Sequence, residues 1–161
     1  NKSIYNEIVH ECGKTSIIKA GTLNKNFNSL VHILQICEGC NGVCTFCCTR
    51  VARGHLVSYP VKMIVDEAKK AISNGCKELQ VTAQDSACYG LDSGESFSKL
   101  LNELASIEGD FRIRVGMMHP KSLKGQLDEV ISAFKNNEKI YNFVHIPIQT
   151  GSPKVLEEMN Y

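Results

Sequence analysis

The sequence predicts an α/β fold made of parallel β/α units, and three observations support this class. Strands are predicted at residues 30–37, 79–82, 111–115 and 141–148; the first is apolar at most positions, and in 111–115 apolar residues alternate with Arg112 and Arg114. After each of these strands comes a segment whose apolar residues recur at helical spacing. Glycine-containing turns separate many of these segments. Four units in series predict a parallel sheet with right-handed crossovers and functional groups at the carboxyl ends of the strands.

The first unit carries the most distinctive sequence. Residues 30–37 are apolar at most positions, which predicts a strand buried on both faces. A cysteine-rich loop follows directly. Ser58 is a candidate N-cap, Pro60 falls in the first turn, and Asn74-Gly75 ends the predicted helix.

The later units repeat the alternation. Their predicted order is a strand at 79–82, a helix at 97–107, a strand at 111–115, a helix at 127–134, a strand at 141–148 and a helix beginning at Ser152-Pro153. Residues 1–29 are expected to be a linker or the end of a preceding segment, and residues 30–161 to form the core. Because the edge of the sheet would stay open after four units, we expect the core to be incomplete at its C-terminus.

Composition narrows the function classes. The 161 residues carry 18 Lys+Arg and 17 Asp+Glu, a net charge of +1, so no strong field favours nucleic acid within this segment. No apolar run approaches the roughly 18 residues of a membrane span, and no signal-peptide pattern is present. Eight cysteines without a secretion signal favour metal ligation over disulfides. We therefore expect a cytoplasmic protein with no membrane partner.

The strongest motif is the C-x3-C-x2-C run formed by Cys40, Cys44 and Cys47. Gly42 lets this loop curl back, and closely spaced thiolates converge on a soft metal centre. A four-iron cluster normally takes four cysteines, so three would leave one iron open to a substrate. The three cysteines are therefore predicted as metal ligands and as the catalytic centre.

A zinc site is the alternative at this loop. Cys37 and Cys40 form one C-x2-C pair and Cys44 and Cys47 another, but zinc ribbons usually place 15–20 residues between such pairs. Only three residues separate them here. The other cysteines are predicted to be packing thiols or idle ones: Cys12, Cys37, Cys48, Cys76 and Cys88.

Further polar residues lie where strands are predicted to end. Arg53 is close to the cysteines in sequence and could pair with a carboxylate or a phosphate, or remain solvated. Arg114 and His119 flank the end of the third strand, where a lone histidine is more often structural than catalytic. Gln149 follows the fourth strand and could hydrogen-bond a ribose.

The cysteine spacing, with aromatic Phe46 before the third cysteine, resembles the radical S-adenosylmethionine (SAM) superfamily. That resemblance implies a partial (β/α)6 TIM-like barrel, of which this chain would supply four units. It also implies a [4Fe-4S] cluster on the three cysteines, SAM bound at the open iron, an electron donor protein and a 5′-deoxyadenosyl radical. Gln84-Asp85 stands where many members carry Gly-Gly-Glu and would hold the SAM amino group. The implied cofactor-binding residues are Phe46, Arg53, Gln84, Asp85, Arg114 and Gln149.

A longer resemblance is to methylthiotransferases, in the archaeal and eukaryotic branch that modifies N6-threonylcarbamoyladenosine of tRNA. It is carried by residues 38–47, 52–60, 82–90, 114–120, 145–152 and 159–161. It implies 2-methylthiolation of the adenosine next to the anticodon, a second [4Fe-4S] cluster in an N-terminal domain, and a C-terminal RNA-binding domain. Residues 1–29 would then be the end of that N-terminal domain. The alternative is another radical SAM enzyme acting on a different RNA base, a protein or a small molecule.

Overall fold

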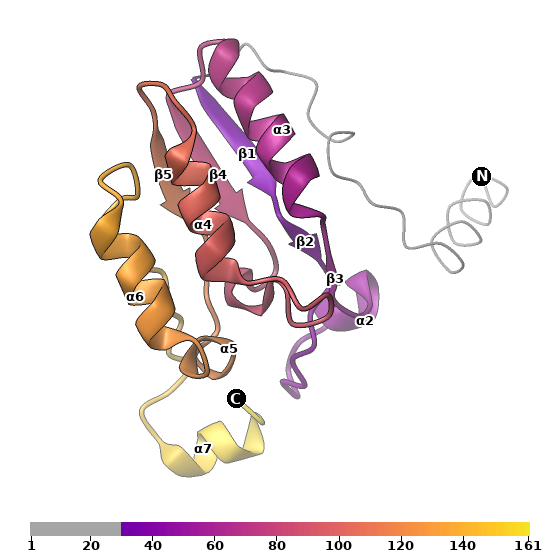
Figure 1. Cartoon of the computed structure of the whole chain (residues 1–161). Helices are drawn as coiled ribbons and strands as arrows, with labels where there is room; N and C mark the ends of the chain where they lie inside the picture. Colours follow the sequence, from indigo (N-terminus) through magenta and orange to yellow (C-terminus); the bar gives the residue numbers. More distant parts are fainter. Residues whose placement is uncertain (1–29) are drawn as a thin grey trace, which may run out of the picture.

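The central feature of the fold is a parallel three-stranded sheet. A computed structural model describes residues 30–161 (Figure 1), so the linker expected at 1–29 lies outside the described residues. The strands are β1 (Val31–Gln35), β4 (Glu78–Thr82) and β5 (Arg112–Val115), in the order β1-β4-β5. Both strand pairs are parallel. The predicted α/β class with β/α units is therefore confirmed.

Helices cover one face of this sheet (Figure 1). The four predicted helices are present as α3 (Val61–Ser73), α4 (Phe97–Ser106), α6 (Leu127–Asn136) and α7 (Pro153–Glu158). Ser152 is the N-cap of α7, the helix predicted to begin at Ser152-Pro153, and its hydroxyl accepts a hydrogen bond from the Val155 amide. The predicted N-cap at Ser58 is wrong. Pro60 occupies that position, and the Ser58 hydroxyl instead accepts from the Gly90 amide at 2.8 Å.

Five short elements have no counterpart in the prediction. They are β2 (Cys37–Glu38), α2 (Thr49–Arg53), β3 (Val57–Ser58), the 3-10 turn η1 (Ser86–Cys88) and α5 (Pro120–Lys124). Segments of two to five residues are too short to show a hydrophobic period. β2 and β3 pair antiparallel and enclose the cysteine loop between them.

The expectation that the first strand is buried on both faces is wrong. His32 and Leu34 are buried against the helices, whereas Ile33 is 50% exposed. Residues that pair across a sheet share one face, and Ile33 pairs with Gln80, which pairs with Arg114. These three residues therefore lie on the face away from the helices. Only one face of the sheet is therefore covered by the described part of the chain.

The fourth predicted strand, 141–148, is also wrong. Isolated bridges join Ile113 to Ile140 and Met117 to His145, without a continuous ladder. The Phe143 amide bonds back to the Tyr141 carbonyl at 2.7 Å, and this three-residue turn interrupts the extended backbone. The apolar run thus follows the edge of the sheet and pairs with it only at isolated bridges.

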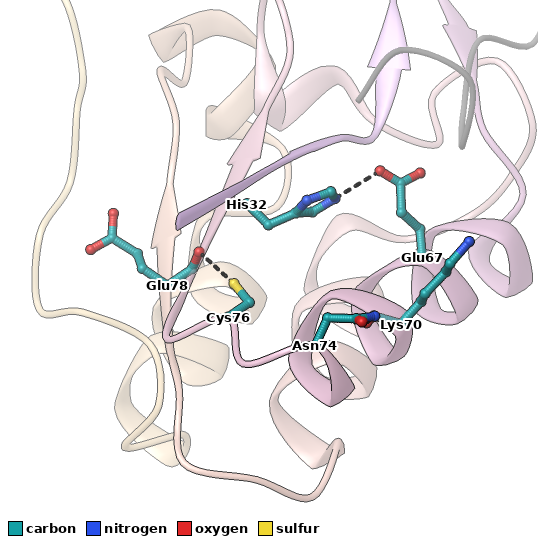
Figure 2. Close-up of polar contacts among 6 residues, drawn as sticks. All are labelled: His32, Glu67, Lys70, Asn74, Cys76 and Glu78. Atoms are coloured by element: carbon teal, nitrogen blue, oxygen red, sulfur yellow. Dashed lines mark hydrogen bonds and ion pairs between the residues drawn. The ribbon is translucent and has the colours of Figure 1, made fainter. Parts of the chain in front are cut away.

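A buried polar contact fastens α3 to β1. Figure 2 shows the His32 ring directed at the Glu67 carboxylate, and Nε2 lies 2.9 Å from Oε1. His32 is 2% exposed and the Glu67 side chain 11%. At the end of the same helix the Asn74 amide donates to the Lys70 carbonyl, and the Cys76 thiol donates to the Glu78 carbonyl. These contacts fix the turn that leads from α3 into β4.

Replacing Glu67 with alanine should lower the free energy of unfolding by about 1–3 kcal/mol, because it leaves the buried His32 nitrogen without its carboxylate partner. Chemical denaturation of the two proteins measures the difference. The matched control is Asp66→Ala one residue earlier, which removes an exposed pair with Lys62 and should cost less. Equal losses in the two variants would contradict a structural role for the buried contact.

None of the helices in residues 30–161 is long and apolar enough to cross a membrane.

Candidate active site at the cysteine loop

The cysteine loop lies beyond the carboxyl end of β1, between β2 and α2. Gly39 begins the loop with φ +75, and a Cβ there would meet the His55 carbonyl oxygen at 2.0 Å. The Cys40 amide donates to the Gly54 carbonyl at 3.3 Å, and the Asn41 side chain accepts from the Leu56 amide. The loop is thus closed on the chain that returns from it.

Two of the predicted ligand cysteines face a cavity of about 260 Å³. Cys40 and Cys44 come from the loop, Asp85 and Cys88 from the segment after β4, and His119 from the segment after β5. Three chain segments that follow different strands therefore meet here, as expected at the carboxyl edge of a parallel sheet. The structure brings Cys40, Cys44, Asp85 and His119 together, as their positions after the strands predict.

The space between two of the sulfur atoms depends on Gly42. A Cβ at this residue would lie 3.1 Å from Cys40 Sγ and 3.9 Å from Cys44 Sγ. The Gly42 amide also donates to Cys40 Sγ at 3.1 Å. Cys47, three residues further along the loop, is near enough that its charge raises the pKa of Cys44, although burial contributes more. All three thiols therefore border one small region.

The chemistry of the donor set bears on which metal centre the loop could hold. Three thiols lie within eight residues, and soft thiolate ligands suit both zinc and iron–sulfur clusters. Within residues 30–161, no group of three or more His, Cys, Asp or Glu side chains is arranged to hold a metal ion. By donor type, the three cysteines fit a [4Fe-4S] cluster with one iron left open.

The three thiols differ in acidity. A hydrogen bond with the Cys88 thiol raises the pKa of Cys40, and burial adds to this effect. Burial also raises the pKa of Cys44. Backbone hydrogen bonding from Arg50, at the start of α2, lowers the pKa of Cys47 below its ordinary value. Cys47 is therefore the first of the three to lose its proton as pH rises.

In the cluster-free protein, iodoacetamide should alkylate Cys47 faster than Cys44 or Cys40 between pH 7 and 8. The thiolate is the reactive form, and a lowered pKa increases its fraction at a given pH. Peptide mass spectrometry over time measures each rate. Cys76, which is 2% exposed, should react only on unfolding and reports intact structure. Faster labelling of Cys40 than of Cys47 would contradict the assigned order.

The Asp85 carboxylate joins the segments that follow β4 and β5 at this site. This residue is 2% exposed, and Oδ1 accepts from the Ala87 amide at 3.1 Å and from the His119 amide at 2.9 Å. The neighbouring residue, Gln84, has a buried Oε1 atom with no hydrogen-bond partner among the described residues. A buried amide oxygen without a donor is costly unless a ligand supplies one. Gln84 therefore offers a hydrogen-bond acceptor next in sequence to Asp85, a residue that lines the cavity.

Two other predicted cofactor contacts have protein partners. The Arg53 guanidinium pairs with the Glu38 carboxylate at 3.1 Å. Arg114 lies over the Phe143 ring, 5.1 Å from its centroid, and lines a second cavity with Glu78. The structure does not bring Arg114 together with the cysteines.

Phe46 and Gln149 are both next to Tyr161. The Phe46 ring is 50% exposed, with its centroid 6.4 Å from that of Tyr161. Gln149 is exposed and hydrogen-bonds the Tyr161 hydroxyl. Burial nevertheless raises the pKa of Tyr161 above its ordinary value.

Sequence reasoning missed the segment that covers the loop, residues 158–161. The Thr45 amide donates to the Met159 carbonyl at 3.0 Å, and its hydroxyl donates to the Glu158 carbonyl at 3.2 Å. The Asn160 side chain donates to the Val43 carbonyl at 3.3 Å. We call residues 158–161 the covering segment. Most of the hydrogen bonds between this segment and the loop use backbone atoms, which are the same for every residue type and therefore leave no pattern in the sequence.

Cys88 was also not anticipated at the site. The sequence predicts a packing thiol, and the structure places it in the cavity lining with its Sγ donating to the Asp85 carbonyl at 2.9 Å. A hydrogen bond with Cys37 raises the pKa of Cys88. A fourth thiol therefore borders the site without belonging to the loop.

A parallel β/α sheet with three loop thiols beyond its first strand defines an α/β protein with a thiol-rich loop at the carboxyl edge of its sheet. Residues 34–161 match the Radical SAM superfamily, and the chain belongs to this superfamily. The predicted family and fold class are confirmed.

Relatives extend the comparison. The chain is 51% identical over 147 residues to the probable threonylcarbamoyladenosine tRNA methylthiotransferase of Methanothermobacter thermautotrophicus, covering 91% of this chain and 34% of the relative. It is 39% identical over 134 residues to the human threonylcarbamoyladenosine tRNA methylthiotransferase, covering 82% and 23%. The chain thus spans about a third or less of these relatives.

A solved structure shares the fold. The radical SAM methyltransferase TsrM from Kitasatospora setae, with cobalamin and a [4Fe-4S] cluster bound, superposes with a TM-score of 0.63 at 16% identity. The match covers 78% of this chain and 24% of that one. At this identity the likeness concerns the fold alone.

Proposed function

We propose that this chain is part of the cluster- and SAM-binding core of a tRNA methylthiotransferase. Its reaction is the radical 2-methylthiolation of N6-threonylcarbamoyladenosine next to the anticodon. The observation that carries the proposal is 51% identity over 147 residues to a relative of that name. Two of the three motif cysteines, Cys40 and Cys44, line one cavity, which supports it. The relatives named after the same reaction include archaeal and eukaryotic proteins.

The cluster ligands in this proposal are Cys40, Cys44 and Cys47. When bound, a [4Fe-4S] cluster there supplies the electron that cleaves SAM to a 5′-deoxyadenosyl radical. The protein's part is to hold the thiolates, to orient SAM and to keep water away. Gly42 keeps the space between Cys40 and Cys44 free of side-chain atoms. Asp85 fixes the neighbouring segments through its two backbone hydrogen bonds.

In this proposal SAM is contacted by Gln84, whose side-chain oxygen lacks a hydrogen-bond donor among the described residues, and by three further residues. The Gln84 oxygen accepts from the SAM amino group, since it is buried without a partner among the described residues. Arg53 reaches the SAM carboxylate only after leaving Glu38, and Phe46 supplies an apolar surface for the cofactor. Gln149, beside Tyr161, is placed to hydrogen-bond the ribose. Arg114 serves the substrate side of the barrel, because it faces away from the helices.

The remaining partners lie outside residues 30–161. The net charge of +1 leaves the basic RNA-binding surface to another part of the protein. An unpaired base of the tRNA anticodon loop can splay into such a site. A second [4Fe-4S] cluster in an N-terminal domain and an electron donor protein complete the reaction. Free thiols throughout the described residues suit the reducing cytoplasm.

The test is nucleoside mass spectrometry of tRNA from cells that lack the gene. Loss of 2-methylthio-N6-threonylcarbamoyladenosine, with its unmethylthiolated precursor accumulating, supports the proposal. Complementation with the full-length gene should restore the modification, and the Cys44→Ala gene should not. An unchanged nucleoside profile, in a strain whose purified protein still cleaves SAM, would favour a radical SAM enzyme with another substrate.

A further inference from the structure

We propose that His119 donates a hydrogen bond from Nε2 to Cys44 Sγ and thereby raises the reduction potential of the bound cluster. The two atoms are 3.7 Å apart. This inference rests on the proposed function, because the cluster belongs to that function. It assigns a positioning and tuning role to a residue that sequence reasoning regards as structural.

The tautomer follows from the other ring nitrogen. His119 Nδ1 accepts a hydrogen bond from the Lys121 amide at 3.1 Å, where the side chain caps the first turn of α5. An accepting nitrogen carries a lone pair, so in the neutral ring the proton is on Nε2. We assign this proton from the hydrogen-bond network. Nε2 is then a donor, and Cys44 Sγ is the acceptor in front of it.

Several contacts hold the ring in this direction. The His119 amide donates to Asp85 Oδ1 at 2.9 Å, which fixes the backbone. The Tyr161 ring lies against the imidazole, with centroids 4.2 Å apart and planes at 47°. Tyr161 is itself anchored, because its hydroxyl donates to the Pro147 carbonyl at 2.8 Å. The ring is therefore confined by α5, by Asp85 and by the covering segment.

A donor aimed at a ligand sulfur acts on the cluster electrostatically. Hydrogen bonds to cluster sulfurs and their outer-shell partners tune reduction potentials. Reduction adds negative charge that the thiolates share. The Nε2–H dipole stabilises the reduced form more than the oxidised form, so the potential rises.

Two substitutions separate the hydrogen bond to sulfur from the helix cap. In His119→Asn the side-chain oxygen replaces Nδ1 and keeps the cap on Lys121, but no atom reaches Cys44. In His119→Gln the amide nitrogen extends to the place of Nε2 and restores the donor. The potential is measured by EPR-monitored redox titration of the full-length protein, loaded anaerobically, using the signal that SAM addition alters.

The potential of His119→Asn should be more negative than that of the parent, and His119→Gln should return toward the parent value. Independently, ¹⁵N NMR of the cluster-free protein should show the Nε2–H tautomer for His119. Equal potentials in parent and His119→Asn, equal lowering in both variants, or an Nδ1–H tautomer would overturn the inference. A parent protein that takes up no cluster would instead defeat the proposed function, and this inference with it.

Discussion

Replacing Cys44 with alanine is expected to abolish the iron–sulfur absorbance and the cleavage of SAM, while the fold remains. Cys44 borders the cavity and its side chain takes no part in the apolar core. If the three cysteines are the ligands, Cys44→Ala leaves two thiolates for a cluster that already has one iron without a protein ligand. Visible absorbance and iron and sulfide content after anaerobic loading measure the first loss, and 5′-deoxyadenosine formation measures the second.

The matched control is Cys48→Ala. Cys48 is exposed and immediately follows Cys47, the last cysteine of the motif. It should keep the cluster and SAM cleavage at the parent level, and circular dichroism of both variants should match the parent. Retained SAM cleavage by Cys44→Ala would refute the assignment of the cluster ligands.

The second large effect is expected at Gly39. An alanine there would need φ +75, which costs about 1–2 kcal/mol for an L-residue. Its Cβ would also overlap the His55 carbonyl oxygen at 2.0 Å, a backbone atom that cannot rotate away. We expect Gly39→Ala to lower the free energy of unfolding by more than about 3 kcal/mol and to displace the cysteine loop. Thermal denaturation and cluster content measure these losses.

Gly94→Ala provides the comparison. Gly94 also has a positive φ, +78, but nothing lies within 4 Å of a Cβ placed there. Only the conformational cost of about 1–2 kcal/mol should appear, with cluster content unchanged. A Gly39 variant as stable as the Gly94 variant would show that the backbone around His55 relaxes to accept the side chain.

Much of the fold could be predicted because long elements have strong periods. The helices α3, α4 and α6 each bury an apolar stripe in the core, and β4 and β5 alternate buried apolar residues with more exposed polar ones. The error at residues 30–37 has a different cause. Ile33 is as apolar as Leu34, so composition cannot distinguish the covered face from the uncovered one. The prediction of a strand at 141–148 failed because the turn between Tyr141 and Phe143 interrupts the extended backbone and leaves only isolated bridges to the sheet.

Part of the site could be predicted from the sequence and part could not. The three loop thiols could be predicted because the C-x3-C-x2-C spacing is itself the signal. The contact between His119 and Cys44 joins residues 75 positions apart and depends on how the segments after β4 and β5 meet. Arg53 was expected to point at a ligand, and the structure pairs it with Glu38, which no spacing rule anticipates. Tertiary proximity, rather than residue type, decides these contacts.

The covering segment has a consequence for biosynthesis. Thr45 and Glu158 are 113 residues apart, so at about 5–20 residues per second the ribosome needs roughly 6–23 s to complete the pair. During that interval the loop has its bonds to Gly54 and Leu56, but the Thr45 and Val43 backbone lacks the partners that residues 158–160 later supply. The last restraints on the cysteine loop therefore form only when the end of this segment has been synthesised.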